Sequence, residues 1–271
     1  MRPLRAGELG FRTDLIVLSR GSEVERHEGF TVVRAPDNPT FFWGNCLVFD
    51  RAPRAEDSAR WPELFARHVV ARQPASRHWA FAWLEDAPGD VAPLLGQGCT
   101  LLESLVMTAE RVRPCALRVP AALRALNAAD WTALFELQML TREPEHPPDA
   151  YAVFKRRQIA SWRALAEAGR GQWFGAFIDG ALVAALGIYA EAERVGGVRL
   201  ARYQHVVTHP DWRRRRLASA LVELAGDYAL RELAADRLVM IADAHDVARI
   251  AYAGAGFTAA GPWRGLQRLG Y

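Results

Sequence analysis

The segment from Val206 to Leu221 constrains the fold most, because it joins the end of a strand to the start of a helix. The strand-like run ends at Thr208, Pro210 prevents its extension, and a helix is expected to begin inside the run of four arginines, 213–216. The first N–H groups of a helix have no partner within the helix, and the helix dipole adds a positive potential there. This junction therefore predicts a site that binds a phosphate group with backbone N–H groups.

The segments around this junction follow the order of an α+β domain. Asp179-Gly180 is a tight-turn dipeptide between two extended segments, so these strands are expected to be antiparallel. The expected strands are 115–119, 173–178, 182–190, 198–208, 237–242 and two short ones near Phe257 and Leu266, and the expected helices begin near 130 and span 149–168, 214–233 and 247–253. The order predicts a sheet with a crossover helix after its fourth strand.

The composition excludes several classes of protein. With 51% hydrophobic and 24% charged residues, the chain is neither disordered nor collagen-like. No apolar run approaches the roughly 18 residues of a membrane helix, so we expect a cytoplasmic protein with no membrane partner. The three cysteines lack metal-ligand spacing, so reduced thiols and no metal are expected.

The basic residues are almost all arginine: of 34, only Lys155 is a lysine. This skew is typical of a GC-rich genome. Because 31 acidic residues leave a formal charge of only +3, the composition does not favour a nucleic-acid partner.

The junction resembles the coenzyme-binding motif of the GNAT superfamily of acyl-CoA N-acyltransferases. That family carries Arg/Gln-x-x-Gly-x-Gly/Ala after a Val-x-Pro strand end, and Arg213, Ala218 and Pro210 match it. Arg216 occupies the place of the usual first glycine, and Thr208 stands where valine is common. The resemblance implies a mixed, mostly antiparallel sheet flanked by helices, acetyl-CoA as co-substrate, and no metal.

A second match lies downstream, in residues 245–257. It resembles the family's Asn-x-x-Ala-x-x-x-Tyr-x-x-x-Gly-Phe helix, with His245 in the asparagine position and Tyr252 at the tyrosine. In the family that tyrosine often protonates the departing thiolate, so Tyr252 is the expected general acid, and a packing tyrosine is the alternative. The residues that the resemblance assigns to the coenzyme are Val206, Val207, Thr208, Arg213, Arg214, Arg215, Arg216, Leu217, Ala218, Ser219 and His245.

His205 is the first candidate for the base that deprotonates a substrate ammonium, because its ordinary pKa is near neutrality. Strand alternation places it on one face with Tyr203 and Val207, unless a bulge inverts the order. A buried structural histidine is the alternative interpretation. Glu191 and Glu193 are further candidates, and a water chain without a single base is a third possibility.

The N-terminal half contains a faint copy of the C-terminal pattern. Gly96-Gln97-Gly98-Cys99-Thr100 is similar to Gly254-Ala255-Gly256-Phe257-Thr258, which favours an internal duplication, and two unrelated glycine turns are the alternative interpretation. In this half a helix from Trp61 and strands over 30–34, 42–49, 78–84 and 99–109 are expected. The segment 50–57 has no glycine and carries acids where a phosphate would lie, so the copy is expected to have lost its coenzyme site.

We therefore predict a tandem protein with a degenerate GNAT-like or accessory domain at 1–114 and an acetyl-CoA-binding GNAT domain at 115–271. The predicted reaction transfers an acetyl group directly to a primary amine of a small molecule or peptide. Two other interpretations stay open: a non-catalytic acyl-CoA-binding or regulatory module, and a nucleic-acid-binding protein that uses Arg213–Arg216. The sequence gives neither the acceptor amine nor the oligomeric state.

Overall fold

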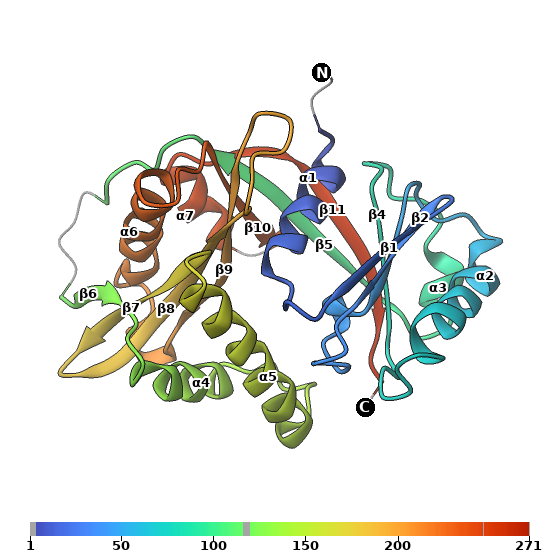
Figure 1. The fold of residues 1–271 in the computed structure, drawn as a ribbon, viewed down its shortest axis with the longest axis horizontal. Coiled ribbons are helices and arrows are strands. Elements are labelled where there is room, and N and C mark those ends of the chain that lie inside the picture. Colours follow the sequence, from blue (N-terminus) through green and yellow to red (C-terminus); the bar gives the residue numbers. More distant parts are fainter. Residues whose placement is uncertain (1–3, 116–119, 246, 271) are drawn as a thin grey trace. The chain divides into compact units, whose positions relative to one another are not determined.

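The computed structural model describes residues 4–115, 120–245 and 247–270. The chain forms two compact units, shown in Figure 1. Unit 1 comprises Met1–Val106, Ile241–Asp246 and Ala259–Tyr271, and unit 2 comprises Met107–Met240 and Val247–Thr258. The domain limits expected from the sequence, 1–114 and 115–271, remain a proposal. Each compact unit of the structure also includes short segments from the other half of the sequence.

Unit 1 has a sheet with helices on both faces. Its strands lie in the order β1-β2-β3-β4-β11-β5, with the neighbours β3 and β4 parallel and β4 and β11 antiparallel. The strands are β1 (Glu23–His27), β2 (Phe30–Arg34), β3 (Cys46–Phe49), β4 (Trp79–Trp83), β5 (Thr100–Ala109, whose last three residues belong to unit 2) and β11 (Thr258–Arg268, whose first residue belongs to unit 2); the helices are α1 (Ala6–Asp14), α2 (Asp57–Phe65) and α3 (Ala92–Leu95).

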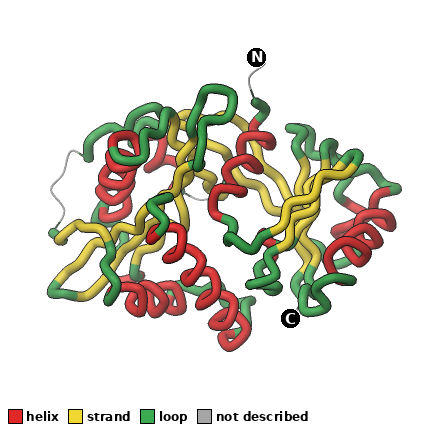
Figure 2. The backbone as a smooth tube through the Cα atoms, viewed as in Figure 1, coloured by secondary structure: helices red, strands yellow, loops and turns green. Residues whose placement is uncertain are grey.

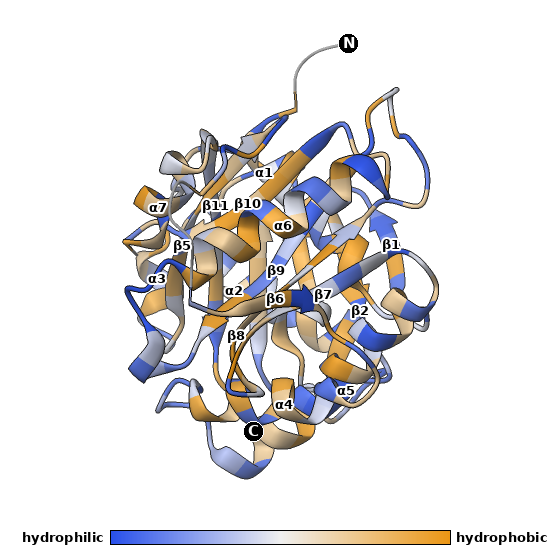
Figure 3. Ribbon diagram, turned by 90° about the vertical axis from the view of Figure 1, so that its left-hand side faces the viewer, coloured by the Kyte–Doolittle hydropathy of each residue, from blue (hydrophilic) through white to orange (hydrophobic). Residues whose placement is uncertain are grey.

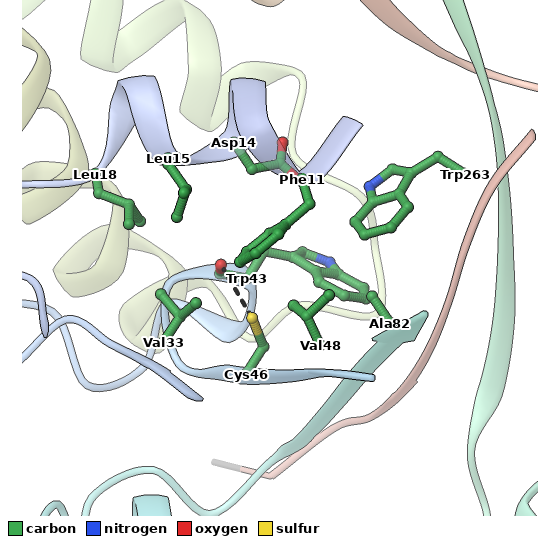
Figure 4. A pocket seen from close by; sticks show the side chains of 10 residues that line it. All are labelled: Phe11, Asp14, Leu15, Leu18, Val33, Trp43, Cys46, Val48, Ala82 and Trp263. Atoms are coloured by element: carbon green, nitrogen blue, oxygen red, sulfur yellow. Dashed lines mark hydrogen bonds between the residues drawn. The ribbon is translucent and has the colours of Figure 1, made fainter. Parts of the chain in front are cut away.

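Alternating side chains divide the core of unit 1 into two layers. Leu47 and Phe81 pack with Trp61 of α2, whereas the next residues, Val48 and Ala82, line a narrow pocket beneath α1 (Figure 4). Figure 4 shows the rings of Phe11 and Trp43 lying across this pocket. Its lining is apolar apart from Asp14 and Cys46, so it offers no set of polar groups for acyl transfer.

Unit 2 contains the junction of strand and helix. Its strands lie in the order β10-β9-β8-β7-β6, with β9 and β10 parallel and the other neighbours antiparallel. The strands are β6 (Ala122–Ala125), β7 (Gly171–Ile178), β8 (Ala181–Ala190), β9 (Leu200–Thr208) and β10 (Arg237–Asp243, whose last three residues belong to unit 1); the helices are α4 (Asp130–Leu140), α5 (Pro148–Glu167), α6 (Leu217–Arg231) and α7 (Ala248–Gly254).

Helices cover opposite faces of the sheet of unit 2 (Figures 1 and 2). On β7, Trp173 packs against Trp162 of α5 at 4.8 Å between ring centroids, and the next residue, Phe174, packs against Tyr228 of α6 at 5.3 Å. Because successive strand residues point to opposite faces, α5 and α6 lie on different sides of the sheet. The hydropathy colours of Figure 3 show that α6 carries both hydrophobic and hydrophilic residues, as expected for a helix with one buried face.

The expected mixed, mostly antiparallel α+β architecture is confirmed, including the antiparallel run β7-β8-β9 and the parallel pair joined by α6. Three local predictions were wrong. A single long strand, β11, replaces the two short final strands, α6 begins at Leu217 and not at Arg214, and a 3-10 turn at Phe42–Gly44 precedes β3. Residues 116–119 of the strand expected at 115–119 lie outside the described residues, and Cys115 is not in a strand. No helix in the described ranges is long and apolar enough to span a membrane.

Candidate acyl-transfer site

The N-terminus of α6 presents backbone N–H groups that no side chain caps in the described part of the chain. The first helical hydrogen bond runs from the Ala220 N–H to the Arg216 carbonyl, at 3.1 Å. Arg214 and Arg216 both adopt left-handed backbone conformations, with φ of +61° and +60°. The left-handed conformation explains why glycine is usual at the position of Arg216, since a β-carbon is strained there.

The arginines around this N-terminus, Arg213–Arg216, are exposed. Arg215 stacks over the ring of Trp212 at 4.4 Å, and the Arg213 Nε donates to the Thr208 carbonyl at 3.4 Å. No carboxylate forms an ion pair with any of the four among the described residues. This end of α6 therefore combines donor groups with uncompensated positive charge, which suits the pyrophosphate of a coenzyme.

The corresponding loop of unit 1, after β3, has its N–H groups already occupied. The buried Asp57 carboxylate accepts from the Arg54 N–H at 2.9 Å and from both terminal nitrogens of Arg51, at 2.6 and 3.0 Å. The Glu85 carboxylate accepts from the Ala52 N–H at 3.0 Å. Burial alone would raise the pKa of Asp57, but the hydrogen bonds from Arg51 and Arg54 hold it below its ordinary value. Internal carboxylates thus fill the place where a phosphate would lie.

The edge of β9 that faces β10 is only partly paired within unit 2. The parallel ladder joins Leu200, Ala201 and Arg202 to β10, and no further pair follows among the described residues, although β9 continues to Thr208. The segment Val206–Thr208 thus lies beyond the last pair, next to the start of the junction. An extended ligand arm can add there as a strand.

A β-bulge turns His205 toward α5. The pairing of β8 with β9 shifts between Ala185 and Gly187, so that one residue of β8 opposes two of β9, and His205 has φ of +47°. Tyr203 donates its phenol hydrogen to the Val222 carbonyl of α6 at 2.7 Å, whereas the His205 ring packs edge-on against Trp162 of α5 at 5.7 Å. The expectation that Tyr203 and His205 share a face was wrong because of this bulge.

His205 meets a residue that the sequence analysis did not assign, Lys155 of α5. The Lys155 Nζ lies 3.1 Å from the His205 Nε2 and donates to the Gln158 Oε1 at 2.8 Å. The ammonium also lies over the rings of Tyr151, Phe154 and Trp162, at 5.1, 4.7 and 5.4 Å. Lys155 is 1% exposed.

The surroundings of this pair favour neutral side chains. Desolvation lowers the pKa of Lys155 to about 7. His205 as a residue is exposed, but its ring contacts both Trp162 and Lys155. Desolvation of the ring, and then the Lys155 ammonium, hold the pKa of His205 well below its ordinary value. A lysine that loses its proton near neutral pH can serve as a base.

The remaining candidates lie in different surroundings. Tyr252 is nearly buried on α7, and His245 is exposed, 3.8 Å from Glu103 through its Nε2. Glu191 is buried and accepts from the Leu200 N–H at 2.9 Å, so it closes the turn between β8 and β9 and is a poor base candidate. Glu193 lies in the exposed turn that follows. No group of His, Cys, Asp and Glu side chains suited to a metal ion occurs in the described ranges.

Comparison with known proteins places this site in a family. The model of the acetyltransferase (GNAT) family matches residues 131–257, which include α5, the bulge of β9, the junction and Tyr252. Residues 131–257 belong to the GNAT family. That family is one of acyltransferases, and its members use an acyl-CoA as co-substrate.

Solved structures extend the likeness in fold to the whole chain. A functionally unknown conserved protein from Staphylococcus epidermidis has a TM-score of 0.73 at 12% identity, over 93% of this chain and 95% of that one. A GCN5-related N-acetyltransferase from Kribbella flavida has a TM-score of 0.66 at 13% identity, over 99% and 98%. A tandem GNAT protein from the clavulanic acid biosynthesis pathway has a TM-score of 0.55 at 16% identity, over 97% and 89%. The N-terminal half thus resembles a second GNAT copy. The search of curated proteins found no match.

Proposed function

We propose that unit 2 binds acetyl-CoA and transfers its acetyl group directly to a primary amine of a small molecule or peptide. The observation that carries this proposal is the uncapped N-terminus of α6 inside the GNAT match, with Arg216 left-handed at the place of the motif's glycine. The same loop in unit 1 is occupied by Asp57 and Glu85, which supports unit 2 as the coenzyme-binding unit. The reaction has no need of a metal ion, and a cytoplasmic location stays a prediction.

In the proposed reaction the pyrophosphate lies on the N–H groups of Arg214 to Ser219, and the pantetheine arm extends along Val206–Thr208. His205 removes a proton from the substrate ammonium, and the free amine attacks the thioester carbon. An N–H group of Val206–Thr208 stabilises the oxyanion. The carbon–sulfur bond then breaks, and Tyr252 protonates the thiolate. The second proton of the nitrogen passes through water to restore the Tyr252 phenol, so that the products are an amide, coenzyme A and the one proton that His205 took.

Calorimetric titration of the full chain with acetyl-CoA tests the first half of this proposal. Ala218 is half-buried in the first turn of α6, so Ala218→Leu is expected to weaken binding by crowding the phosphate path. Ala166, half-buried in the last turn of α5, is the matched control, and Ala166→Leu should leave the affinity unchanged. Equal affinities of both variants and the wild type would show that acetyl-CoA does not bind at this end of α6.

A turnover screen with acetyl-CoA across amines, amino acids, aminoglycosides and peptide N-termini tests the second half. Release of free coenzyme A that depends on one acceptor is expected. Binding of acetyl-CoA without turnover of any acceptor would favour an acyl-CoA-binding module, and steeply salt-dependent binding of DNA or RNA would favour a nucleic-acid partner for Arg213–Arg216.

A further inference from the structure

We infer that Lys155 holds the proton that His205 takes from the acceptor ammonium, so that the two side chains work as one base. This inference rests on the proposed function and adds a residue to it. Lys155 acts through His205 and is therefore a positioning residue, whereas His205 meets the substrate. The geometry that points to this role is the 3.1 Å contact between the Lys155 Nζ and the His205 Nε2.

Within the described ranges Lys155 has no anionic partner that would make it a structural cation. Its contacts among the described residues are the Gln158 Oε1, the His205 Nε2 and three aromatic rings, all of them neutral groups. A buried ammonium without a carboxylate is costly, and cation–π contacts offset only part of that cost. Lys155 therefore loses its proton more readily than an exposed lysine does.

The other titratable and charged groups on the elements packed around Lys155 do not change its preference for the neutral amine. From β8 the buried Tyr189 donates its phenol hydrogen to the Trp162 carbonyl at 2.7 Å, and burial raises the pKa of that phenol well above its ordinary value. From β9, Arg202 lies opposite Tyr189 in register, and its Nε donates to the Tyr203 carbonyl at 3.2 Å. On α4, Asp130 pairs with Arg124 and Glu136 is exposed, so neither supplies a charge to Lys155.

The proton moves in two balanced steps. In the ready state Lys155 is a neutral amine that accepts from the His205 Nε2–H, and the His205 Nδ1 lone pair is available, since no described residue bonds to it. The substrate ammonium gives a proton to Nδ1, and the Nε2 proton passes to the Lys155 Nζ. The pair ends as a lysine ammonium beside a neutral imidazole, and it returns to the ready state by releasing one proton to solvent.

This role explains why a lysine stands at this position in a chain whose other 33 basic residues are arginines. A guanidinium keeps its proton throughout the physiological range, so arginine cannot accept one from His205.

The single lysine makes a direct test possible on the full chain without any substrate. In protein labelled with ¹³C at the lysine ε-carbon, only Lys155 gives a signal. Its chemical shift should titrate with a midpoint within about one unit of 7, against about 10.4 for an unperturbed lysine. A midpoint near 10 would overturn the inference, whatever the protein's activity.

The pH profile of turnover then separates a base from a packing lysine. Lys155→Met keeps most of the side-chain volume, and it should lower kcat/KM about a hundredfold above pH 7, the low end for general base catalysis. The acid limb of the profile should move to lower pH, because His205 alone has the lower pKa. Lys155→Arg should not restore turnover, although it would if only a charge were needed.

The matched control is Arg157→Met, which removes a charge from an exposed position of the same helix and should leave the profile unchanged. If Lys155→Met leaves both the acid limb and the rate unchanged, this inference is contradicted but the proposed function is not. Failure of every acceptor amine in the wild type would instead contradict the proposed function, while the lysine titration still reports on the pair.

Discussion

The Lys155 Nζ and the His205 Nε2 lie 3.1 Å apart, although 50 residues separate them in the sequence. Two features of the fold bring them together. The bulge in β9 gives His205 a φ of +47° and turns its ring to the face of the sheet that α5 covers. Burial of Lys155 on α5 then places a readily neutralised amine against the imidazole. The candidate base is therefore a product of tertiary structure and not of any local motif.

Lys155 should make the stability of the chain depend on pH in the alkaline range. Its pKa is about 7 in the folded chain and close to 10.4 when unfolded, so the unfolded state binds more protons between these values. The free-energy cost of burying a lysine that is protonated in the unfolded chain is fully present below pH 7, and it disappears as the pH rises toward 10. The free energy of unfolding of the wild type, relative to Lys155→Met, should therefore rise by up to about 4 kcal/mol over this interval, as measured by urea denaturation at several pH values.

The control for this comparison is again Arg157→Met, whose stability relative to the wild type should not change between pH 7 and pH 10. A stability difference between Lys155→Met and the wild type that is constant over the same interval would show that Lys155 stays protonated in the folded chain.

Arg216→Gly should stabilise the chain. A left-handed residue with a β-carbon is strained by about 1–2 kcal/mol, and the φ of Arg216 is +60°. Glycine removes that strain, so we expect a gain of about 1 kcal/mol in thermal or urea unfolding and an unchanged or improved affinity for acetyl-CoA. Arg213→Gly is the control for the backbone effect, because Arg213 has φ of −63°. Glycine there relieves no strain, adds freedom to the unfolded chain and loses the 3.4 Å hydrogen bond to the Thr208 carbonyl, so it should destabilise the chain. A large loss of affinity in Arg216→Gly would show that its guanidinium itself holds phosphate.

The sequence was sufficient to predict the parts of unit 2 that local patterns determine. Helical spacing located α5 within a residue or two, and Pro210 with the arginine run located the start of the junction. The bulge at His205 was not predictable, because it is seen only in the pairing of β9 with β8. For Lys155 a signal was present, since one lysine among 34 basic residues indicates a position where arginine does not serve. The pattern of α5 showed only that the residue was helical.

The exchange of strand segments between the two sequence halves was not predicted either. β11, from the C-terminal end of the chain, pairs antiparallel with β4 in unit 1, from Arg264 opposite Trp83 to Arg268 opposite Trp79. Residues 107–109, from the N-terminal half, belong to unit 2, where the Thr258 hydroxyl donates to the Thr108 carbonyl at 3.3 Å. Such partners are chosen by long-range pairing, whereas alternation along a strand identifies only its faces.

Asp57→Asn should destabilise unit 1 and leave coenzyme binding intact. Asp57 is fully buried and neutralises Arg51, so its amide variant leaves the guanidinium without its anion and should cost about 2–3 kcal/mol, below the range for a fully buried pair because Arg51 is partly exposed. The affinity for acetyl-CoA, measured by calorimetry well below the unfolding temperature, should match that of the wild type. A marked change in that affinity would show that the coenzyme binds at the loop after β3 and not at α6.

Tyr252→Phe tests the proposed general acid. The substitution removes one oxygen from a side chain that is 9% exposed and keeps the ring, so the fold and the affinity for acetyl-CoA should survive. Turnover should fall by about a hundredfold, the low end for general acid catalysis, because a thiolate is already a fair leaving group. Tyr228→Phe, the same change at a half-buried tyrosine of α6 that packs on Phe174, is the control and should leave turnover unchanged. If Tyr252→Phe keeps the wild-type kcat under conditions where the chemical step limits the rate, the thiolate takes its proton from water, and the ring of Tyr252 serves packing alone.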